Sequence, residues 1–320
     1  MKNFLYPYLM IAFVLVSFSS CVDDDDNGNV INGPTALDYL IDSPNHSILL
    51  EALARTQLDQ TLDNSGSLTI FAPTDQAFTV YLAANDYGSV NAIPEDILRT
   101  LLLYHVQSES RTVDQYNSQY YKTQASVDAN QMDAFVSLTS GVLHINNEAA
   151  VTIPDNRVSN GIVHVVDQVL DLPSVVTLLA ANPIFSNLVT ALNQEGLSII
   201  LEDNTAAAAP FTLFAPSNAA FTALIASNPN DNLNNFEDVL NQNNLNDRLR
   251  YHLLGNQRLR QDDFINGETI NPLGTGTFVI NTDAGVTILD GNGTRTNLIA
   301  TNLTAFNGVI HQLDFVLRQN

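Results

Sequence analysis

The segment Thr69-Ile70-Phe71-Ala72-Pro73-Thr74 decides the fold, because it returns 143 residues later as Thr212-Leu213-Phe214-Ala215-Pro216-Ser217. Two other segments recur in the same order. Tyr104-His105 returns as Tyr251-His252, and Asn160-Gly161-Ile162-Val163-His164 returns as Asn307-Gly308-Val309-Ile310-His311. A period of about 145 residues is too long for a solenoid unit. The chain is therefore predicted to be a duplicated domain.

The duplication sets the expected domain boundaries. A chain of 320 residues with 45% apolar content has enough material to bury two cores. We expect the first domain over 34–171 and the second over 172–320. Only Asp171-Leu172-Pro173 connects the two copies. A linker this short that contains proline predicts restricted motion between the domains.

The N-terminal residues predict export and a lipid anchor. Residues 1–20 combine an early Lys2 with an uncharged, mostly apolar run, which is typical of a signal peptide. The run is shorter than a permanent membrane span requires. Cys21, the only cysteine, follows small residues that resemble a bacterial lipobox, in which the cysteine carries the acyl chains. The alternative is ordinary cleavage nearby, which would leave a soluble secreted protein.

Residues 21–33 are expected to form an acidic, disordered tether. Four consecutive aspartates, Asp23 to Asp26, follow Cys21 after one valine. Such an acidic run resembles the surface-export signal of Bacteroidetes-type lipoproteins. That resemblance implies an outer-membrane lipoprotein of the cell envelope that is exposed at the surface. A solvated spacer is the alternative interpretation of this run.

The charge balance excludes nucleic acid as a partner. The chain has 34 acidic and 12 basic residues and a formal net charge of −22, whereas a polyanion binder needs many cations. A single cysteine excludes a disulfide framework and a cysteine-based zinc site in the folded region. We find no convergent metal ligands, nucleotide fingerprint or nucleophile motif. No metal, no cofactor and no catalytic residue is therefore predicted.

The first repeated box is interpreted as structural. Leu68 to Phe71 is an apolar, strand-like run, and Pro73 closes it because proline cannot donate a ladder hydrogen bond. Thr74 is a good N-cap for a following helix. The second copy repeats the arrangement with Phe214, Pro216 and Ser217.

The Tyr-His pairs lie on a predicted core stripe. Leu98, Leu102 and His105 have the i, i+4, i+7 spacing of one helix face, and the second copy places His252 in the same pattern. A buried imidazole hydrogen-bonded to the backbone is the favoured interpretation. The alternative is that the pairs contact a ligand.

The third box predicts a buried central strand in each copy. His164 and His311 lie in runs that are apolar on both faces and that follow an Asn-Gly turn signal. The structural residues of this box are Asn160, Gly161 and His164 in the first copy and Asn307, Gly308 and His311 in the second. Asp167 and Asp314, three residues after each histidine, are expected to bind the imidazoles or to cap a chain end.

Together these three boxes resemble the fasciclin-type (FAS1) domain over nearly all of 34–320. The resemblance implies an α/β fold of mixed α+β type, with two tandem FAS1-like domains. Each would have a wedge-like sheet core of short strands with packed α-helices. It also implies extracellular adhesion or binding. In animal members a Tyr-His motif is implicated in receptor adhesion, so Tyr104, His105, Tyr251 and His252 are candidate ligand-binding residues.

We therefore expect a non-enzymatic, extracellular adhesion or binding module, anchored to the membrane only through its lipid. Its partner would be an extracellular protein or glycan. Two other functions stay open. Paired carboxylates for glycoside hydrolysis need no proximity in sequence, which keeps a glycan-handling hydrolytic enzyme as an alternative. A structural envelope spacer is the other.

Overall fold

The first and third repeated boxes form neighbouring parallel strands within the sheet of each repeat. In the computed structural model, which describes residues 33–63, 66–227 and 233–319, β1 (Leu68–Pro73) pairs with β7 (Gly161–Val166). The register sets Phe71 opposite His164. In the second repeat β8 (Phe211–Pro216) pairs in the same way with β14 (Gly308–Leu313) and sets Phe214 opposite His311. The predicted signal peptide, Cys21 and nearly all of the tether lie outside the described residues.

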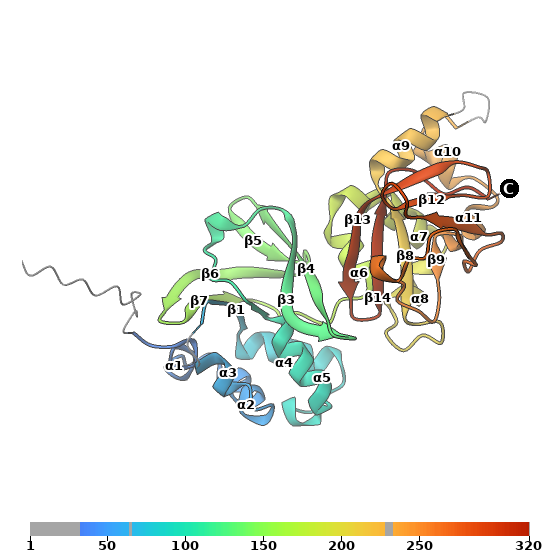
Figure 1. Cartoon of the computed structure of the whole chain (residues 1–320). Coiled ribbons are helices and arrows are strands. Elements are labelled where there is room, and N and C mark those ends of the chain that lie inside the picture. The colour runs from blue at the N-terminus through green and yellow to red at the C-terminus, as the bar shows by residue number, and fades with distance from the viewer. Residues whose placement is uncertain (1–32, 64–65, 228–232, 320) are drawn as a thin grey trace, which may run out of the picture. The chain divides into compact units, whose positions relative to one another are not determined.

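The first repeat has one seven-stranded sheet in the order β2-β1-β7-β6-β5-β4-β3, and β1 and β7 form its parallel pair. Its other strands are β2 (Val106–Gln107), β3 (Gln119–Val127), β4 (Asn130–Thr139), β5 (Val142–Ile145) and β6 (Ala149–Val158). Its helices are α1 (Ala36–Ile41), α2 (Ser47–Arg55), α3 (Asp59–Asp63), α4 (Asp75–Ala84) and α5 (Glu95–Tyr104). These helices gather on one side of the sheet (Figure 1).

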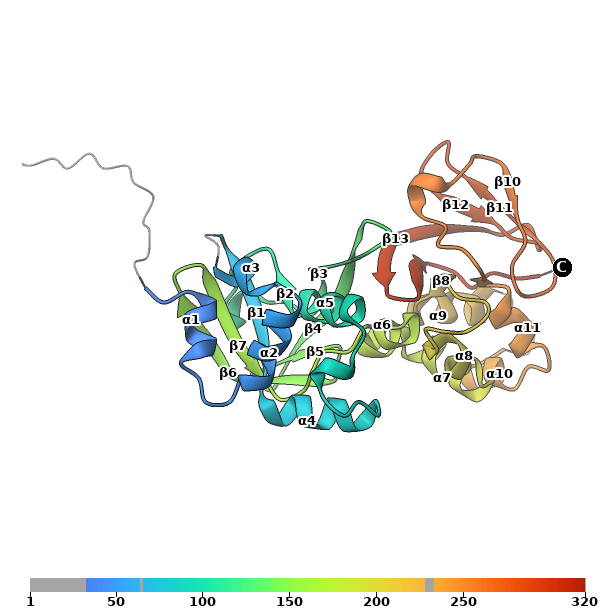
Figure 2. The ribbon, with the colours of Figure 1, turned by 90° about the horizontal axis from the view of Figure 1, so that it is seen from below.

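The second repeat has the sheet order β10-β11-β12-β13-β14-β8-β9. Its other strands are β9 (Leu253–Leu254), β10 (Glu268–Ile270), β11 (Phe278–Asn281), β12 (Thr287–Leu289) and β13 (Arg295–Ala305). Its helices are α6 (Val175–Ala181), α7 (Ser186–Gln194), α8 (Leu197–Glu202), α9 (Asn218–Ser227), α10 (Phe236–Leu240) and α11 (Leu245–Arg250). Figure 2 shows helices α7 to α11 on one side of this repeat and strands β10 to β12 on the other. The predicted α/β architecture of two tandem domains is confirmed.

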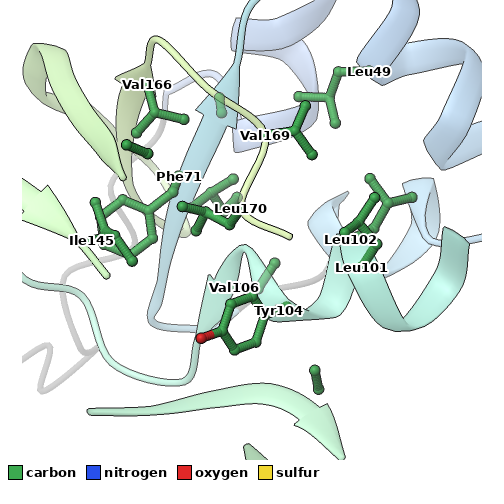
Figure 3. Packing of buried hydrophobic residues seen from close by; sticks show 14 of the residues in the cluster. Leu49, Phe71, Leu101, Leu102, Tyr104, Val106, Ile145, Val166, Val169 and Leu170 are labelled. Carbon is green, nitrogen blue, oxygen red and sulfur yellow. The ribbon is translucent and has the colours of Figure 1, made fainter. Parts of the chain in front are cut away.

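Apolar side chains from the central strands and the helices make the core of the first repeat. Phe71 from β1, Val166 from β7 and Leu102 from α5 are among its buried members (Figure 3). Each is 3% exposed or less, and a fully buried side chain of this size stabilises the fold by roughly 1.5–3 kcal/mol. The core therefore lies between the sheet and the helices that cover it.

The described helices are short relative to the thickness of a bilayer. Within the three described ranges, no single helix is long and apolar enough to cross a bilayer. Val175–Ala181 and Pro183–Gln194 reach the required length and composition only as a pair, and the pair is bent by 106°. Residues of both segments are buried in the core of the second repeat.

Candidate functional site

The histidine of each Tyr-His pair joins a helix end to the last segment of its repeat. Helix α5 ends at Tyr104, and His105 is its C-cap residue. The Nδ1 of His105 donates to the carbonyl of Leu101 at 2.8 Å, and Nε2 accepts the N–H of Leu170 at 2.9 Å. Helix α11 ends one residue earlier, so Tyr251 is its C-cap. The imidazoles of His105 and His252 are both buried and exposed to almost no solvent in this conformation.

His252 repeats this arrangement in the second repeat. Its Nδ1 donates to the carbonyl of Arg248 at 2.9 Å, and its Nε2 accepts the N–H of Leu317 at 2.9 Å. Burial lowers the pKa of His105 and of His252 to about 4, because the charged form loses its hydration. Both rings are therefore neutral at pH 7.

The tyrosines of the pairs are buried as completely as the histidines. The hydroxyl of Tyr104 donates to the carbonyl of Asp133 at 2.8 Å and accepts from the Nδ2 of Asn146 at 2.9 Å. The hydroxyl of Tyr251 donates to the carbonyl of Thr277 and accepts the N–H of Gly291 at 3.0 Å. A buried hydroxyl needs such partners, and these satisfy it. We propose that the four residues of the Tyr-His pairs are scaffold.

The asparagine of the third box ties two helices of each repeat together. The Oδ1 of Asn160 accepts the N–H of Ala36 at the start of α1, and its Nδ2 donates to the carbonyl of Leu62 in α3. In the second repeat Asn307 accepts from Val175 and donates to Leu201. Both asparagines are buried, so each holds helix-end groups that water would otherwise have to satisfy.

The histidine of the third box fixes a neighbouring strand and a loop. The Nδ1 of His164 accepts the N–H of Asp155 at 3.1 Å, and its Nε2 donates to the carbonyl of Arg111 at 2.9 Å. Asp155 has a left-handed backbone with φ of 58° and lies at an irregularity of β6. The ring of Phe71 stacks on the imidazole with centroids 5.6 Å apart. The imidazole thus holds a β-bulge in place.

His311 makes the corresponding contacts in the second repeat. Its Nδ1 accepts the N–H of Asn302, which has φ of 61°, and its Nε2 donates to the carbonyl of Leu259. Phe214 stacks on it with centroids 5.4 Å apart. Burial lowers the pKa of His311 to about 4. Burial also lowers the pKa of His164.

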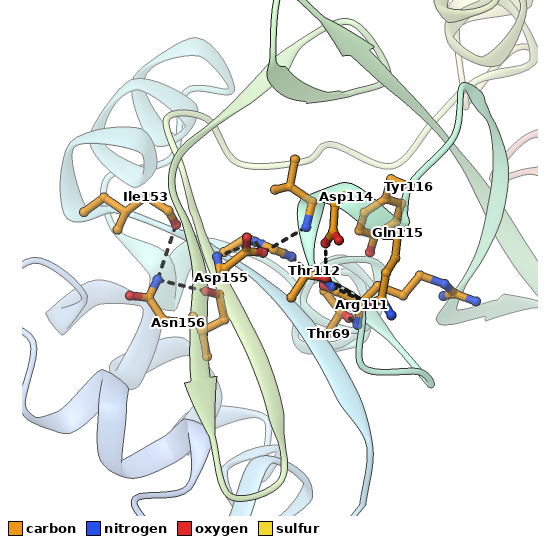
Figure 4. Close-up of polar contacts among 12 residues, drawn as sticks. Thr69, Arg111, Thr112, Asp114, Gln115, Tyr116, Ile153, Asp155 and Asn156 are labelled. Carbon is orange, nitrogen blue, oxygen red and sulfur yellow. Dashed lines mark hydrogen bonds and ion pairs between the residues drawn. The ribbon is translucent and has the colours of Figure 1, made fainter.

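A threonine of the first box holds the same loop residue from the other side. The hydroxyl of Thr69 accepts the N–H of Arg111 at 2.9 Å and donates to the carbonyl of Glu109 (Figure 4). Thr212 does the same for Leu259 and Gln257 in the second repeat. One loop residue per repeat therefore has both its backbone N–H and its carbonyl held by box side chains.

The remaining box residues begin a helix or end a strand. Pro73 and Pro216 are the last residues of β1 and β8. The hydroxyl of Thr74 accepts the N–H of Ala77 and caps α4, and the hydroxyl of Ser217 accepts the N–H of Ala220 in α9. These contacts are local to the strand end and the first turn of the following helix.

The expectation for the two aspartates is half right. Asp167 accepts the backbone N–H of Ala150, and Asp314 accepts that of Asn297. They secure strand ends and do not bind the imidazoles, because backbone groups already occupy both nitrogens of each ring. The sequence spacing shows that each carboxylate is near a histidine in the chain. It does not show which hydrogen-bond donor each carboxylate meets in the fold.

An open groove lies beside the connector between the two repeats. It has a volume of about 490 Å³, and its lining includes Asn147, Glu148, Asp171, Thr177, Glu202 and Asn204. Burial, and after it the neighbouring Asp171, raises the pKa of Glu148. Its lining is dominated by amide, hydroxyl and carboxyl groups. In the described part of the chain, no three His, Cys, Asp or Glu side chains are placed to hold a metal ion.

Comparison with known proteins identifies the family. The family model for the fasciclin domain matches residues 44–173 and again 183–319. The chain belongs to the fasciclin family. Each match contains one copy of the three boxes, so the fasciclin repeats are the duplicated domains recognised in the sequence.

Curated relatives include animal and cyanobacterial proteins. Transforming growth factor-beta-induced protein ig-h3 from Sus scrofa is 25% identical over 82% of this chain, which spans 36% of that protein. Human periostin is 25% identical, and the chain spans 29% of its length. The uncharacterized protein sll1735 of Synechocystis is 31% identical over 43% of this chain and 97% of its own length. The chain thus spans about a third of the two animal proteins.

A solved structure has the same fold. A FAS1 domain pair from the insect cell adhesion molecule Fasciclin I matches 84% of this fasciclin protein and 95% of its own chain. The TM-score is 0.52 at 18% sequence identity. At this identity the match supports the shared fold and the tandem arrangement.

Several residues of the polar network were not found from the sequence. Asn146, which binds the Tyr104 hydroxyl, has a positive φ in the turn between β5 and β6. The Asn146-Asn147 dipeptide between two apolar runs was an available turn signal. Thr69 was inside the repeated box but carried no signal that separates it from any strand threonine.

The buried position of the Tyr-His pairs gives a direct prediction. We expect His105→Ala and His252→Ala each to lower the free energy of unfolding by on the order of 1–3 kcal/mol, because a backbone N–H and a carbonyl lose their partner. Differential scanning calorimetry on both variants, beside a binding assay, measures this. Two variants that melt like the wild type but bind less would instead make the pairs ligand contacts.

Proposed function

We propose that this fasciclin protein is a non-enzymatic adhesion module of the cell surface that binds an extracellular protein or glycan. The observation that carries the proposal is that the repeated polar side chains bind backbone groups and hold the fold. They are therefore not arranged as a catalytic site. His105, His164 and Asn160, with their counterparts, all bind backbone groups inside their own repeat. None of them lines the groove of about 490 Å³ described above. Similarity to the fold of an insect cell adhesion molecule supports the same conclusion.

The groove is the proposed contact region. Hydroxyl-rich ligands are recognised by amides, hydroxyls and carboxylates that alternate donors with acceptors. Asn147, Thr177 and Asn204 supply the first two classes, and Glu148 and Asp171 supply the third. A few apolar side chains, Leu172 among them, complete the lining. This composition favours a glycan over an apolar ligand.

The experiment is a binding screen of the full chain on glycan arrays, purified matrix proteins and the envelope fraction of the source cell. We expect Glu148→Gln combined with Asn204→Ala to reduce binding at least tenfold with an unchanged melting temperature. Glu95→Gln, which changes an exposed carboxylate in α5, is the matched control and should bind like the wild type.

The two alternative functions correspond to other outcomes of the same screen. Release of a cleaved glycan product during the incubation would identify a hydrolytic enzyme. Retention by the envelope fraction alone, unaffected by the groove variant, would identify a structural spacer.

The proposed anchor at Cys21 is tested separately. We expect metabolic labelling with a radioactive fatty acid to mark the wild type and not Cys21→Ala. Detergent partitioning should move the variant into the aqueous phase, because it lacks the acyl chains that hold the protein at a membrane. Equal membrane association of the two proteins would contradict the lipid anchor.

A further inference from the structure

The strands β3 and β4 form a hairpin at the edge of the first sheet that is longer than its counterpart in the second repeat. The two strands have 9 and 10 residues, whereas their counterparts β10 and β11 in the second repeat have 3 and 4. Both repeats belong to one compact unit of the chain, Asn32–Asn320. Strand β4 contacts β13 and α6 of the second repeat. The long hairpin of the first repeat thus provides contacts to β13 and α6 of the second repeat.

Each repeat places one aromatic side chain against the core of the other. Tyr120 from β3 packs on the hydrophobic core of the second repeat, and its hydroxyl donates to the carbonyl of Leu178 at 2.7 Å. Phe306, in the turn between β13 and β14, packs on the core of the first repeat. Its backbone N–H donates to the carbonyl of Pro173 at 2.7 Å. The exchange is reciprocal, so separating the repeats would expose both rings.

A buried carboxylate depends on the contact as well. Asp133 from β4 is 3% exposed, and its Oδ2 accepts the backbone N–H of Thr304 in β13 at 2.7 Å. The same oxygen accepts from the Nζ of Lys122 at 2.7 Å. Burial raises the pKa of Asp133, and a carboxylate in such a position is costly unless it is paired and hydrogen-bonded. The second repeat therefore supplies one of the two donors that this oxygen needs.

An arginine of the second repeat holds the tip of the hairpin. Arg258, on the loop fixed by Thr212 and His311, donates from its guanidinium to the Oδ2 of Asp128 at 2.5 Å. It also donates to the carbonyl of Phe306 at 2.5 Å. The Arg258 side chain is 14% exposed and that of Asp128 is 64% exposed, so water shields the aspartate side of this ion pair and the arginine side is largely covered by protein.

We propose that Tyr120, Asp128, Asp133, Arg258 and Phe306 form a latch that holds the two repeats in one orientation. Tandem domains usually move relative to each other unless their interface is large and apolar. Here two aromatic contacts and two charged contacts act together, and the three-residue connector adds to the constraint. The two repeats are then expected to unfold in a single cooperative transition. Their surfaces keep a fixed relative orientation.

Distance measurements between spin labels test the latch. The background is full-length Cys21→Ala, with cysteines introduced by Asp96→Cys in α5 and Asn241→Cys after α10, both at exposed positions. We expect a single narrow distance distribution. Adding Tyr120→Ala with Arg258→Ala should widen the distribution at least twofold. A broad distribution without these two substitutions, or an equally narrow one with them, would overturn the proposal.

A matched control separates the latch from general destabilisation. Gln119→Ala with Arg295→Ala removes the exposed neighbour of Tyr120 on β3 and an exposed arginine on β13. The control should keep the narrow distribution. In calorimetry we expect the wild type and the control to unfold in one transition and the latch variant to show two separate ones. Two transitions in the control as well would contradict the assignment to Tyr120 and Arg258.

Discussion

Gly161→Ala is expected to unfold the first repeat or to lower its free energy of unfolding by about 4 kcal/mol or more. A Cβ built at this position would lie 2.0 Å from the carbonyl oxygen of Leu68, and the residue has φ of +153°. The clashing atom belongs to the backbone of β1, which pairs with β7 along its whole length. Neither strand has room to move without losing that pairing.

The control is Gly88→Ala, because no heavy atom lies within 4 Å of a Cβ at that position. We expect it to change stability by less than about 1 kcal/mol. Gly308→Ala tests the same role in the second repeat, where the Cβ would lie 2.6 Å from the carbonyl oxygen of Phe211. Urea denaturation of the three variants gives the comparison. A Gly161→Ala protein as stable as Gly88→Ala would contradict the close approach of the two strands.

Acid is expected to destabilise the protein mainly through its buried histidines. The pKa of His105, His252 and His311 is about 4 in the fold, below the ordinary value of 6.5. Each group therefore contributes stability that is fully present above pH 6.5 and is lost as the pH falls from 6.5 to 4. At pH 4.5 the loss is on the order of 2 kcal/mol for each ring. Denaturant titrations at pH 7.5, 5.5 and 4.5 measure it.

Replacing one ring isolates its share of the effect. His252→Gln should lower the number of protons taken up on unfolding between pH 6.5 and 4.5 by about one. Gln119→Ala, which removes an exposed side chain of β3 that does not titrate, is the control and should leave the pH dependence unchanged. Stability that is flat from pH 7.5 to 4.5 in the wild type would show that these rings are not held neutral by burial.

The local elements of the fold were predictable from the sequence. An apolar run closed by proline gave the strand β1, and Thr74 gave the start of α4. The stripe of Leu98 and Leu102 gave α5, because their spacing follows one helix face. These signals are short-range, so each can be read in a window of about ten residues.

The pairing of distant elements was not predictable in the same way. The sequence marked His164 as buried but did not show that β1 would lie beside it in parallel register. A pattern of apolar residues shows that a strand is buried. It does not show which strand pairs with it, because many strands have the same pattern. The long hairpin and its contact through Tyr120 had no signal within one repeat. Its counterparts β10 and β11 lie in a segment of equal length in the second copy, so segment length gave no sign of the longer strands.

The contacts of the box histidines His105 and His164 fix their protons at opposite ring positions. His105 carries its proton on Nδ1, where it donates to Leu101, and His164 carries its proton on Nε2, where it donates to Arg111. The two neutral tautomers have different ring-nitrogen chemical shifts, so a nitrogen-15 spectrum would separate them without any introduced label. Loss of one signal pattern would report opening at the helix end, and loss of the other would report opening at the bulge in β6. Each repeat thus contains a pair of built-in spectroscopic reporters.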